Sequence, residues 1–312
     1  MPTPLTTTSD NLDGWCQRWN NRKHSWRHVS EGGFDKRRYA VEPIEETPAK
    51  NFIAQHHYSG TFVAAIRRYG LLDLADGRRL VGVIVLSSPM QERVLTLPFP
   101  RLEPYSQSAE LGRLVLLDEV PANAESYAMR RAFKLAAGDG FRGVVAYSDP
   151  TPRTRRNSAG ELEEYMPGHW GDSYQGCGGD YYGISRRVKE AVLPDSTRMT
   201  DRTLRKVIGA ESGYRGVVTR LVDFGATPPT AADVASKESR KAWLAAALAT
   251  AAERWETSGG KHRYAFKIGG RRQKRKTVLD VKTKPYPKRD LVLAWTAGVT
   301  GRPRGVTVHV CG

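Results

Sequence analysis

Three short polar clusters contain the side chains that are best suited to do chemistry. They are residues 55–60 (QHHYSG), residues 147–150 (YSDP) and residues 167–176 (PGHWGDSYQG). Histidine titrates near neutral pH, and a carboxylate can orient it or share a metal ion with it, so these residue types indicate acid/base catalysis or metal binding. The candidate residues are His57, Tyr58, Ser148, Asp149, His169, Trp170 and Tyr174.

Each cluster also has an ordinary structural explanation. Two adjacent histidines cannot point the same way, so at most one of His56 and His57 is expected to face a site. A lone histidine is often a hydrogen-bonded structural residue, and an aspartate before a proline, such as Asp149, commonly begins a turn. Both interpretations stay open from the sequence.

Alternating strands and helices are expected to position these clusters. The patterns predict strands at 38–43, 61–69 and 80–87, and a helix at 47–54. Residues 109–150 then form the most regular unit of the chain. A strand at 111–117 is followed by a polar turn, a helix with small or apolar residues at i, i+3, i+4 spacing over 128–136, and a second strand at 144–147. Such a unit aims a helix N-terminus and a strand end at one point, where anions bind and catalytic side chains are often found.

The stretch from 149 to 183 is rich in Gly, Tyr and Pro and is too long for a plain connector, which is typical of a functional loop. Further helices are expected at 200–211 and within 231–256. No internal repeat is found in the sequence.

The charge of the chain indicates a polyanionic partner. Lys and Arg number 49 against 33 acidic residues, which gives a net charge of +16 and a pI near 9.9. Nucleic acid fits such an excess better than a membrane surface does, although a merely soluble basic surface is the alternative. The three cysteines have neither disulfide-framework nor zinc-ligand spacing. Without a signal-peptide pattern or a long apolar run, we expect a soluble, cytoplasmic protein with no membrane contact.

Both ends of the chain are basic. The N-terminal arm places Trp15, Trp19 and Trp26 among Arg, Lys and His, a mixture that suits nucleic-acid contact or, alternatively, docking of the tryptophans on the main domain. Residues 261–289 contain twelve Lys or Arg and one acid. The basic residues alternate with strand-like patches (YAFKI, TVLDV, LVLAW). This alternation favours a basic hairpin or ribbon that contacts phosphates, and the alternative is a solvated flexible segment. The predicted nucleic-acid contacts are Arg271, Arg272, Lys274, Arg275 and Lys276.

These motifs, taken in order, resemble those of a known family. HHYSG, ELGRLVLLDEVPANAESY, VVAYSDP and PGHWGDSYQGCGGDYYG, with HRYAF and KPYPK in the tail, resemble the phage Mom family of DNA adenine-modification proteins. The resemblance covers roughly residues 45–225 and the tail motifs. It implies a GNAT-like acyltransferase fold of the α+β class, with a mixed sheet flanked by helices and basic extensions at both ends.

The resemblance also implies a function. The family converts the exocyclic N6 amine of adenine in duplex DNA to a carbamoylmethyl-type derivative, which protects phage DNA from restriction. By motif, His57, Tyr58, Asp149 and Tyr174 match a constellation proposed as catalytic and iron-binding, with His57, Asp149 and Tyr174 as candidate metal ligands. A metal-free acid/base set is the alternative.

The resemblance leaves the acyl donor open. Arg113 and Ser126 match positions linked to an acyl-CoA donor such as acetyl-CoA. The turn at 118–124 nevertheless lacks glycine and carries two acids, and Glu125 in the first helical turn would repel a phosphate. Because a glycyl group and a carbamoylmethyl group are isomers, glycyl-tRNA is a second candidate donor, and a basic surface would suit tRNA as well as DNA.

An adenine amine inside a duplex must be exposed before it can react, and base flipping is the usual solution. Trp170, Tyr181 and Tyr182 are the candidates to stack on a flipped adenine, with Ser148 and His169 beside them as substrate contacts, although each aromatic could be ordinary core. We expect an N-terminal arm at 1–37, a catalytic domain at 38–226 and a nucleic-acid-binding extension at 227–312. The rival functions are acyl transfer to a protein or small-molecule amine, and nucleic-acid binding without catalysis.

Overall fold

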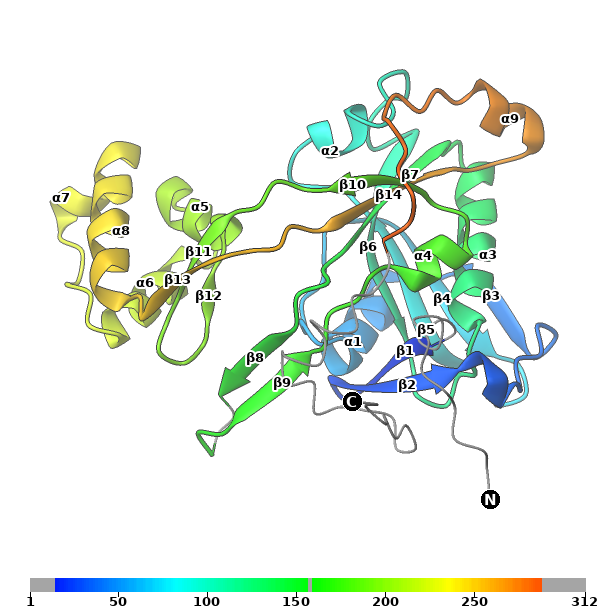
Figure 1. The fold of residues 1–312 in the computed structure, drawn as a ribbon, viewed down its shortest axis with the longest axis horizontal. Helices are drawn as coiled ribbons and strands as arrows, with labels where there is room; N and C mark the ends of the chain where they lie inside the picture. The colour runs from blue at the N-terminus through cyan, green and yellow to red at the C-terminus, as the bar shows by residue number, and fades with distance from the viewer. Residues whose placement is uncertain (1–14, 157–158, 288–312) are drawn as a thin grey trace, which may run out of the picture. The chain divides into compact units, whose positions relative to one another are not determined.

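A mixed seven-stranded sheet forms the centre of the fold in the computed structural model, which describes residues 15–156 and 159–287 (Figure 1). The strand order is β10-β14-β7-β6-β5-β4-β3. Neighbouring strands are antiparallel except β6 and β7, which are parallel. The strands are β3 (Tyr39–Pro43), β4 (Ala65–Asp73), β5 (Arg79–Ser87), β6 (Ser108–Leu116), β7 (Gly143–Ser148), β10 (Asp180–Ile184) and β14 (His262–Lys267).

Two helices flank this sheet and supply much of its core. These are α1 (Glu46–His56), which buries Phe52 and Ile53, and α3 (Ala124–Gly138), which buries a stripe of small and apolar residues. The stripe follows the predicted helical spacing and lies in the same hydrophobic cluster as the sheet. The predicted α+β fold class, a mixed sheet flanked by helices, is therefore confirmed.

Short elements complete this first unit. They are the hairpin strands β1 (Trp15–Asn20) and β2 (Lys23–His28), the 3-10 helix η2 (Val29–Glu31), and the short helices α2 (Arg93–Thr96), α4 (Asp172–Gly176) and α9 (Arg271–Lys276).

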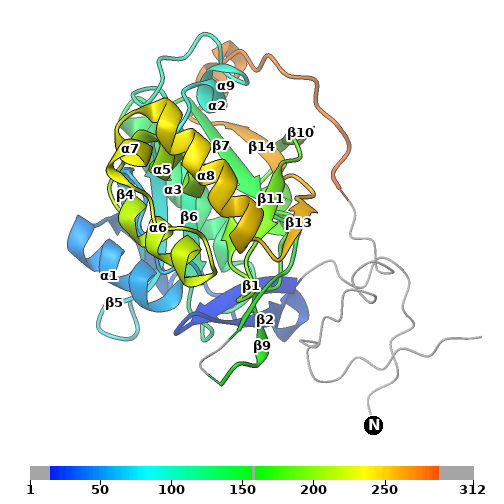
Figure 2. The same ribbon diagram turned by 90° about the vertical axis from the view of Figure 1, so that its left-hand side faces the viewer.

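A second unit consists of residues 151–164 and 185–260 and has its own core (Figure 2). Helix α8 (Lys237–Ala251) packs against α5 (Asp201–Gly209), α6 (Tyr214–Asp223) and α7 (Ala231–Val234). The strands β11 (Lys189–Val192), β12 (Arg198–Met199) and β13 (Arg254–Thr257) form a small sheet, and β8 (Arg153–Arg156) pairs with β9 (Leu162–Met166). Within the described ranges, every helix is too short or too polar to cross a lipid bilayer.

The units do not follow the domain boundaries expected from the sequence. The N-terminal hairpin and β14 both belong to the first unit, and β14 pairs with β7 over its whole length. The expected basic ribbon is wrong for residues 271–276, which form α9 because Gln273 bonds back to the N–H of Gly270 and begins a helical turn. Residues 277–281 are not a strand, and the LVLAW patch lies outside the described residues.

Candidate active site

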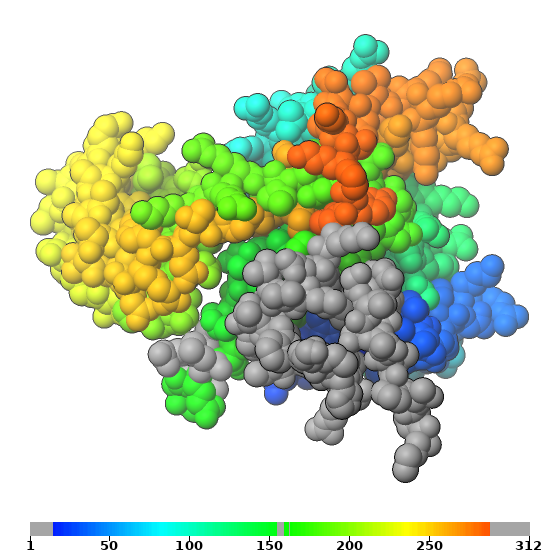
Figure 3. Space-filling view, viewed as in Figure 1, coloured from blue at the N-terminus to red at the C-terminus, as the bar shows by residue number. Residues whose placement is uncertain are grey.

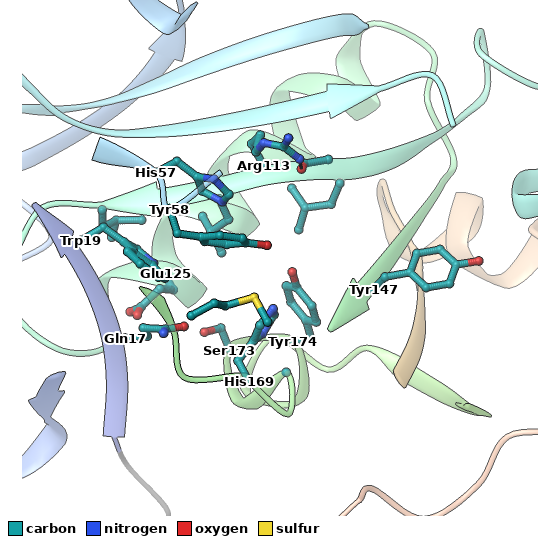
Figure 4. A pocket seen from close by; sticks show the side chains of 16 residues that line it. Gln17, Trp19, His57, Tyr58, Arg113, Glu125, Tyr147, His169, Ser173 and Tyr174 are labelled. Carbon is teal, nitrogen blue, oxygen red and sulfur yellow. Dashed lines mark hydrogen bonds between the residues drawn. The ribbon is translucent and has the colours of Figure 1, made fainter. Parts of the chain in front are cut away.

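A cavity of about 120 Å³ lies where β6 and β7 diverge (Figure 4). The two strands are paired only from Ser108 to Glu110 on β6 and from Gly143 to Val145 on β7. The cavity is lined by β6 residues beyond the last pair, by the α1–β4 connection, by the loop before α4 and by β1. The sheet topology therefore creates the opening that side chains from distant parts of the sequence enclose.

His57 and Tyr58 reach this cavity from the end of α1. The N–H of His57 donates to Ile53 O as the last helical bond, and the chain then turns at Gly60, whose φ is +57°. The N–H of Ser59 donates to Nδ1 of His57 at 3.2 Å, which fixes the ring. The ring of Tyr58 packs on that of His57, with centroids 4.2 Å apart. As expected for adjacent histidines, His56 points elsewhere and accepts the N–H of Asn21 on Nδ1.

Arg113 enters the cavity because β6 carries a bulge. The pairing between β5 and β6 shifts between Val85 and Leu86, which leaves Gly112 as the extra residue. Bulges re-aim side chains and are common beside active sites. The Arg113 guanidinium donates to Thr61 O at 2.9 Å and to Thr61 Oγ1 at 3.1 Å, so it ties β6 to the segment after His57.

Tyr174 and His169 close the opposite side of the cavity. Tyr174 lies on α4, whose preceding residue Gly171 has a φ of +83° and no room for a Cβ beside the ring of Tyr264. The Tyr264 hydroxyl donates to Trp170 O at 2.5 Å and accepts the amide N–H of Gln175 at 3.1 Å. Strand β14, which carries Tyr264, thus holds the glycine-rich loop in place.

Burial controls the protonation of these groups. Desolvation, assisted by the positive charge of Arg113, lowers the pKa of His57 to about 3. Desolvation also raises the pKa of Tyr174 above its ordinary value. His57 is therefore a neutral imidazole and Tyr174 a protonated phenol at physiological pH.

The tautomer of His57 follows from its hydrogen bonds. Because Nδ1 accepts the N–H of Ser59 at 3.2 Å and can also accept from the Ser59 hydroxyl 2.8 Å away, we assign the ring proton of the neutral imidazole to Nε2. His57 therefore offers a hydrogen-bond donor, and its low basicity argues against a role as general base.

Several predicted site residues do not line the cavity. The backbone O of Asp149 accepts the N–H of His169 at 2.8 Å, so this aspartate adjoins the loop without being part of the wall. Ser148 is fully buried, and Trp170 lies over the ring of His262 with centroids 5.0 Å apart. His262, which the sequence did not single out as a site residue, also contacts the Tyr181 hydroxyl through Nδ1.

The predicted stacking role of Tyr181 and Tyr182 does not suit their positions. They are 6% and 4% exposed and belong to hydrophobic clusters of the core. Neither ring borders the cavity, because β10 turns both toward packed side chains rather than solvent.

The N-terminal hairpin supplies a wall that sequence reasoning missed. Gln17 and Trp19 of β1 line the cavity together with Glu125 of α3. Trp19 is 5% exposed and packs against Tyr58, with centroids 5.2 Å apart. For this tryptophan, docking on the main domain is the correct alternative.

The turn between β6 and α3 does not fit the pyrophosphate of coenzyme A. A phosphate site needs N–H groups directed at the ligand. Here Arg18 Nε donates to Val120 O at 2.7 Å, its Nη2 donates to Pro121 O at 2.5 Å, and its Nη1 pairs with Glu125. The turn therefore presents carbonyl and carboxylate oxygens to a cation of its own chain.

The two residues expected to bind acyl-CoA are likewise not brought together. Arg113 lines the cavity, whereas the Ser126 hydroxyl donates to Asn123 O at 3.2 Å and is not part of the lining.

The predicted iron ligands do not form a cluster. His57 and Tyr174 share the cavity wall, and Asp149 is outside it. Across residues 15–156 and 159–287, no three His, Cys, Asp or Glu side chains are grouped so that they could hold a metal ion. The structure therefore does not support this metal set.

Helix α9 lies in the first unit, and Figure 3 shows the orange segment that contains it on the outside of the molecule. All five predicted nucleic-acid contacts of α9 are exposed or partly exposed. One of them, Lys274, also lines a second cavity of about 610 Å³ together with Arg130, Lys134 and Lys267, and its described lining residues include no acidic side chain. We call α9 and these four residues the basic surface.

Comparisons with known proteins give one match at the level of sequence families. Residues 38–160 match the Mom protein family. No curated protein sequence matches the chain.

Among solved structures, a putative phosphinothricin N-acetyltransferase is 12% identical, with a TM-score of 0.30, over 51% of this chain and 92% of its own. A Vibrio cholerae spermidine N-acetyltransferase SpeG mutant is 11% identical, with a TM-score of 0.29, over 51% and 86%. A tandem GNAT protein from the clavulanic acid pathway is 11% identical, with a TM-score of 0.30, over 68% and 65%. Likenesses this distant say nothing about substrate, and the sequence match is the informative one: residues 38–160, which run from β3 through β8, are similar to the Mom protein family.

Proposed function

We propose that this protein is a transferase that attaches a carbamoylmethyl- or glycyl-type group to the N6 amine of adenine in duplex DNA and so protects phage DNA from restriction. The similarity of residues 38–160 to the Mom protein family supports a DNA-modification role. The observation that carries the proposal is a small cavity walled by hydrogen-bond donors from the α1–β4 connection, β6 and α4.

The donors suit acyl transfer. When an amine attacks an acyl carbon, negative charge develops on the acyl oxygen, and fixed donors in a water-poor site stabilise it. Nε2–H of neutral His57, the Tyr174 hydroxyl and the Arg113 guanidinium are donors of this kind. For a glycyl-type group, the N6 nitrogen bonds to the acyl carbon, the bond from that carbon to the carrier breaks with its electron pair on the carrier, and the amine gives up a proton. A carbamoylmethyl group is joined to N6 through its CH₂ carbon, so in that case N6 attacks the CH₂ carbon and the carrier leaves from it. Asp149, beside the loop that carries His169, is the nearby carboxylate we assign to that proton.

The size of the cavity indicates which substrate it holds. At about 120 Å³ it is smaller than the roughly 150 Å³ cavity that accommodates benzene. It therefore suits the transferred group, and the adenine ring, flipped out of the duplex, would approach its opening. We assign the contact with the base to His169, which lines the cavity and whose N–H is bonded to the backbone at the end of β7.

The basic surface and the β6–α3 turn support a proposal for the partners of the protein, which are DNA and the donor of the transferred group. The basic surface would contact the phosphates of DNA. Because the β6–α3 turn holds Arg18, the donor is not expected to bind there through phosphates as an acyl-CoA would. Glycyl-tRNA remains a candidate donor, and incubating the protein and DNA with labelled glycine and a tRNA-charging system tests it. If the DNA is modified without carrying label, the donor is a different one.

Mass spectrometry of nucleosides tests the function itself. DNA from cells that express the protein should contain an altered adenosine that disappears with Asp149→Ala and persists with Asp35→Ala, a matched change at an exposed carboxylate paired with Arg37. Unmodified nucleosides throughout, with DNA binding retained, would instead support a nucleic-acid-binding protein or a transferase for other amines.

A further inference from the structure

Two buried polar atoms on one side of the cavity lack a protein partner. They are Nε2 of Gln17 and Oε2 of Glu125, and neither has a hydrogen bond to any residue of the described part of the chain. Both side chains line the cavity, one from β1 and one from α3 (Figure 4). Buried polar atoms in native proteins are nearly always hydrogen-bonded, so two orphans that line one cavity mark a place where a bound group can supply both missing partners.

The Glu125 carboxylate is fixed and half satisfied. Its other oxygen, Oε1, is paired with Nη1 of Arg18, a fully buried guanidinium that also donates to Gln17 O at 2.9 Å. The Glu125 side chain is 6% exposed. Burial and the Glu125 carboxylate raise the pKa of the neighbouring Cys16 thiol to about 11, so no second negative charge arises beside it. Oε2 is therefore an acceptor whose charge is already balanced by Arg18.

We infer that Gln17 and Glu125 recognise a terminal carboxamide on the group that the enzyme transfers. The carbonyl oxygen of a carboxamide accepts from Gln17 Nε2, and its NH₂ donates to Glu125 Oε2. An ammonium group has three donors and no acceptor, so it would leave Gln17 unpaired, and a carboxylate would meet the Glu125 oxygen with like charge. Of these groups, only the carboxamide satisfies both orphans.

This inference rests on the proposed function only in assigning the amide to the transferred group. A carboxamide terminus belongs to the carbamoylmethyl form, in which N6 bonds to the CH₂ carbon and the carrier leaves from that carbon, whereas the glycyl form ends in an ammonium group and would leave Gln17 unpaired. The N-terminal hairpin thereby becomes the element that determines donor specificity, while its Arg18 fills the turn where a phosphate would otherwise bind.

Binding of small probes to the full-length protein tests the inference without catalysis. Acetamide, N,N-dimethylacetamide, acetate and methylammonium can be titrated while the side-chain NH₂ signals of Gln17 are followed by NMR. Acetamide should shift those signals and bind about tenfold more tightly than each of the other three, because each lacks one of the two hydrogen bonds. Equal binding of acetamide and N,N-dimethylacetamide, or no binding of acetamide, would overturn the inference.

Two variants assign the effect to the pair. Gln17→Leu should weaken acetamide binding about tenfold, measured by ligand-observed saturation transfer, whereas Gln55→Leu on the exposed face of α1 should not change it. Glu125→Gln keeps an oxygen for Arg18 and replaces the acceptor with an NH₂ donor, so preference should move from acetamide to acetate. Unchanged preference in both pocket variants would refute the assignment. If the protein binds acetamide but does not modify DNA, the carboxamide site stands and the proposed function is refuted. If it modifies DNA but does not bind acetamide, the proposed function stands and the carboxamide site is refuted.

Discussion

The protonation of His57 gives a measurable link between pH and stability. An unfolded histidine has a pKa of about 6.5, whereas burial lowers the pKa of His57 in the folded protein to about 3. Between these two pKa values the imidazole of His57 is therefore neutral in the folded protein and protonated in the unfolded protein. The stabilisation is complete above pH 6.5 and is lost progressively as the pH falls toward 3.

The magnitude at pH 5 follows from the two pKa values. The unfolded ring is then almost fully protonated and the folded ring is neutral, which costs the protein about 2 kcal/mol of unfolding free energy relative to pH 8. This figure barely changes if the folded pKa is about 4 instead of about 3, since either value leaves the ring neutral at pH 5.

Comparison with His57→Gln isolates this residue from the other histidines. Urea unfolding of the sheet unit, followed by tryptophan fluorescence, should give a stability difference between wild type and variant that falls by about 2 kcal/mol from pH 8 to pH 5. The imidazole NMR signals of His57 should not titrate over the same range. A stability difference that changes by less than about 0.5 kcal/mol, or an imidazole that titrates near pH 6, would refute both the neutral tautomer and the donor role built on it.

Three further predictions concern other parts of the molecule. Arg18→Met should destabilise the sheet unit by about 3–5 kcal/mol in urea unfolding because it leaves Glu125 buried without a counter-charge, and adding Glu125→Leu should recover most of the loss; additive losses would contradict this. Tyr174→Phe should slow adenosine modification about 10²–10³-fold by removing an oxyanion donor while leaving DNA affinity unchanged, and a wild-type rate would exclude that role. Replacing the five basic residues of α9 with Gln should weaken DNA binding and make the slope of log affinity against log salt shallower by about 0.9 for each phosphate that the protein no longer neutralises, whereas an unchanged slope would place the DNA elsewhere.

Local patterns in the sequence were sufficient to predict β3, β5, β6, β7, α1 and α3, whereas β4 was placed four residues too early and the short helix α2 was not predicted. The apolar spacing over 128–136 predicted α3, and the strands at 80–87 and 144–147 agree with β5 and β7 within a residue or two. Each of these elements is one continuous stretch of the sequence, and the spacing of its apolar residues reflects the face that it buries. Among the residues that line the cavity from this region, His57 and Tyr58 were found from their residue types, and Arg113 was found from the family resemblance.

Contacts between distant segments could not be predicted in this way. The residue spacing in the arm does not predict that Gln17 and Trp19 pack near α3 and the end of α1. A buried arginine such as Arg18 also cannot be distinguished in the sequence from one on the surface. The strand-like pattern of YAFKI was recognised, but it was assigned to a basic extension, whereas β14 lies inside the sheet between β10 and β7. The glycine-rich loop was identified, but which of its aromatics face the cavity depends on its attachment to Tyr264.

The late position of β14 in the chain has a consequence for biosynthesis. Strand β7 is formed from residues 143–148, yet its partner on one side is not made until residue 267 has been added. During translation β7 therefore presents an open, apolar edge while the whole intervening stretch up to β14 is made, and such edges invite pairing with other chains. Nascent chains of this protein should need protection at that edge, and chains terminated before His262 should aggregate rather than accumulate as a folded fragment.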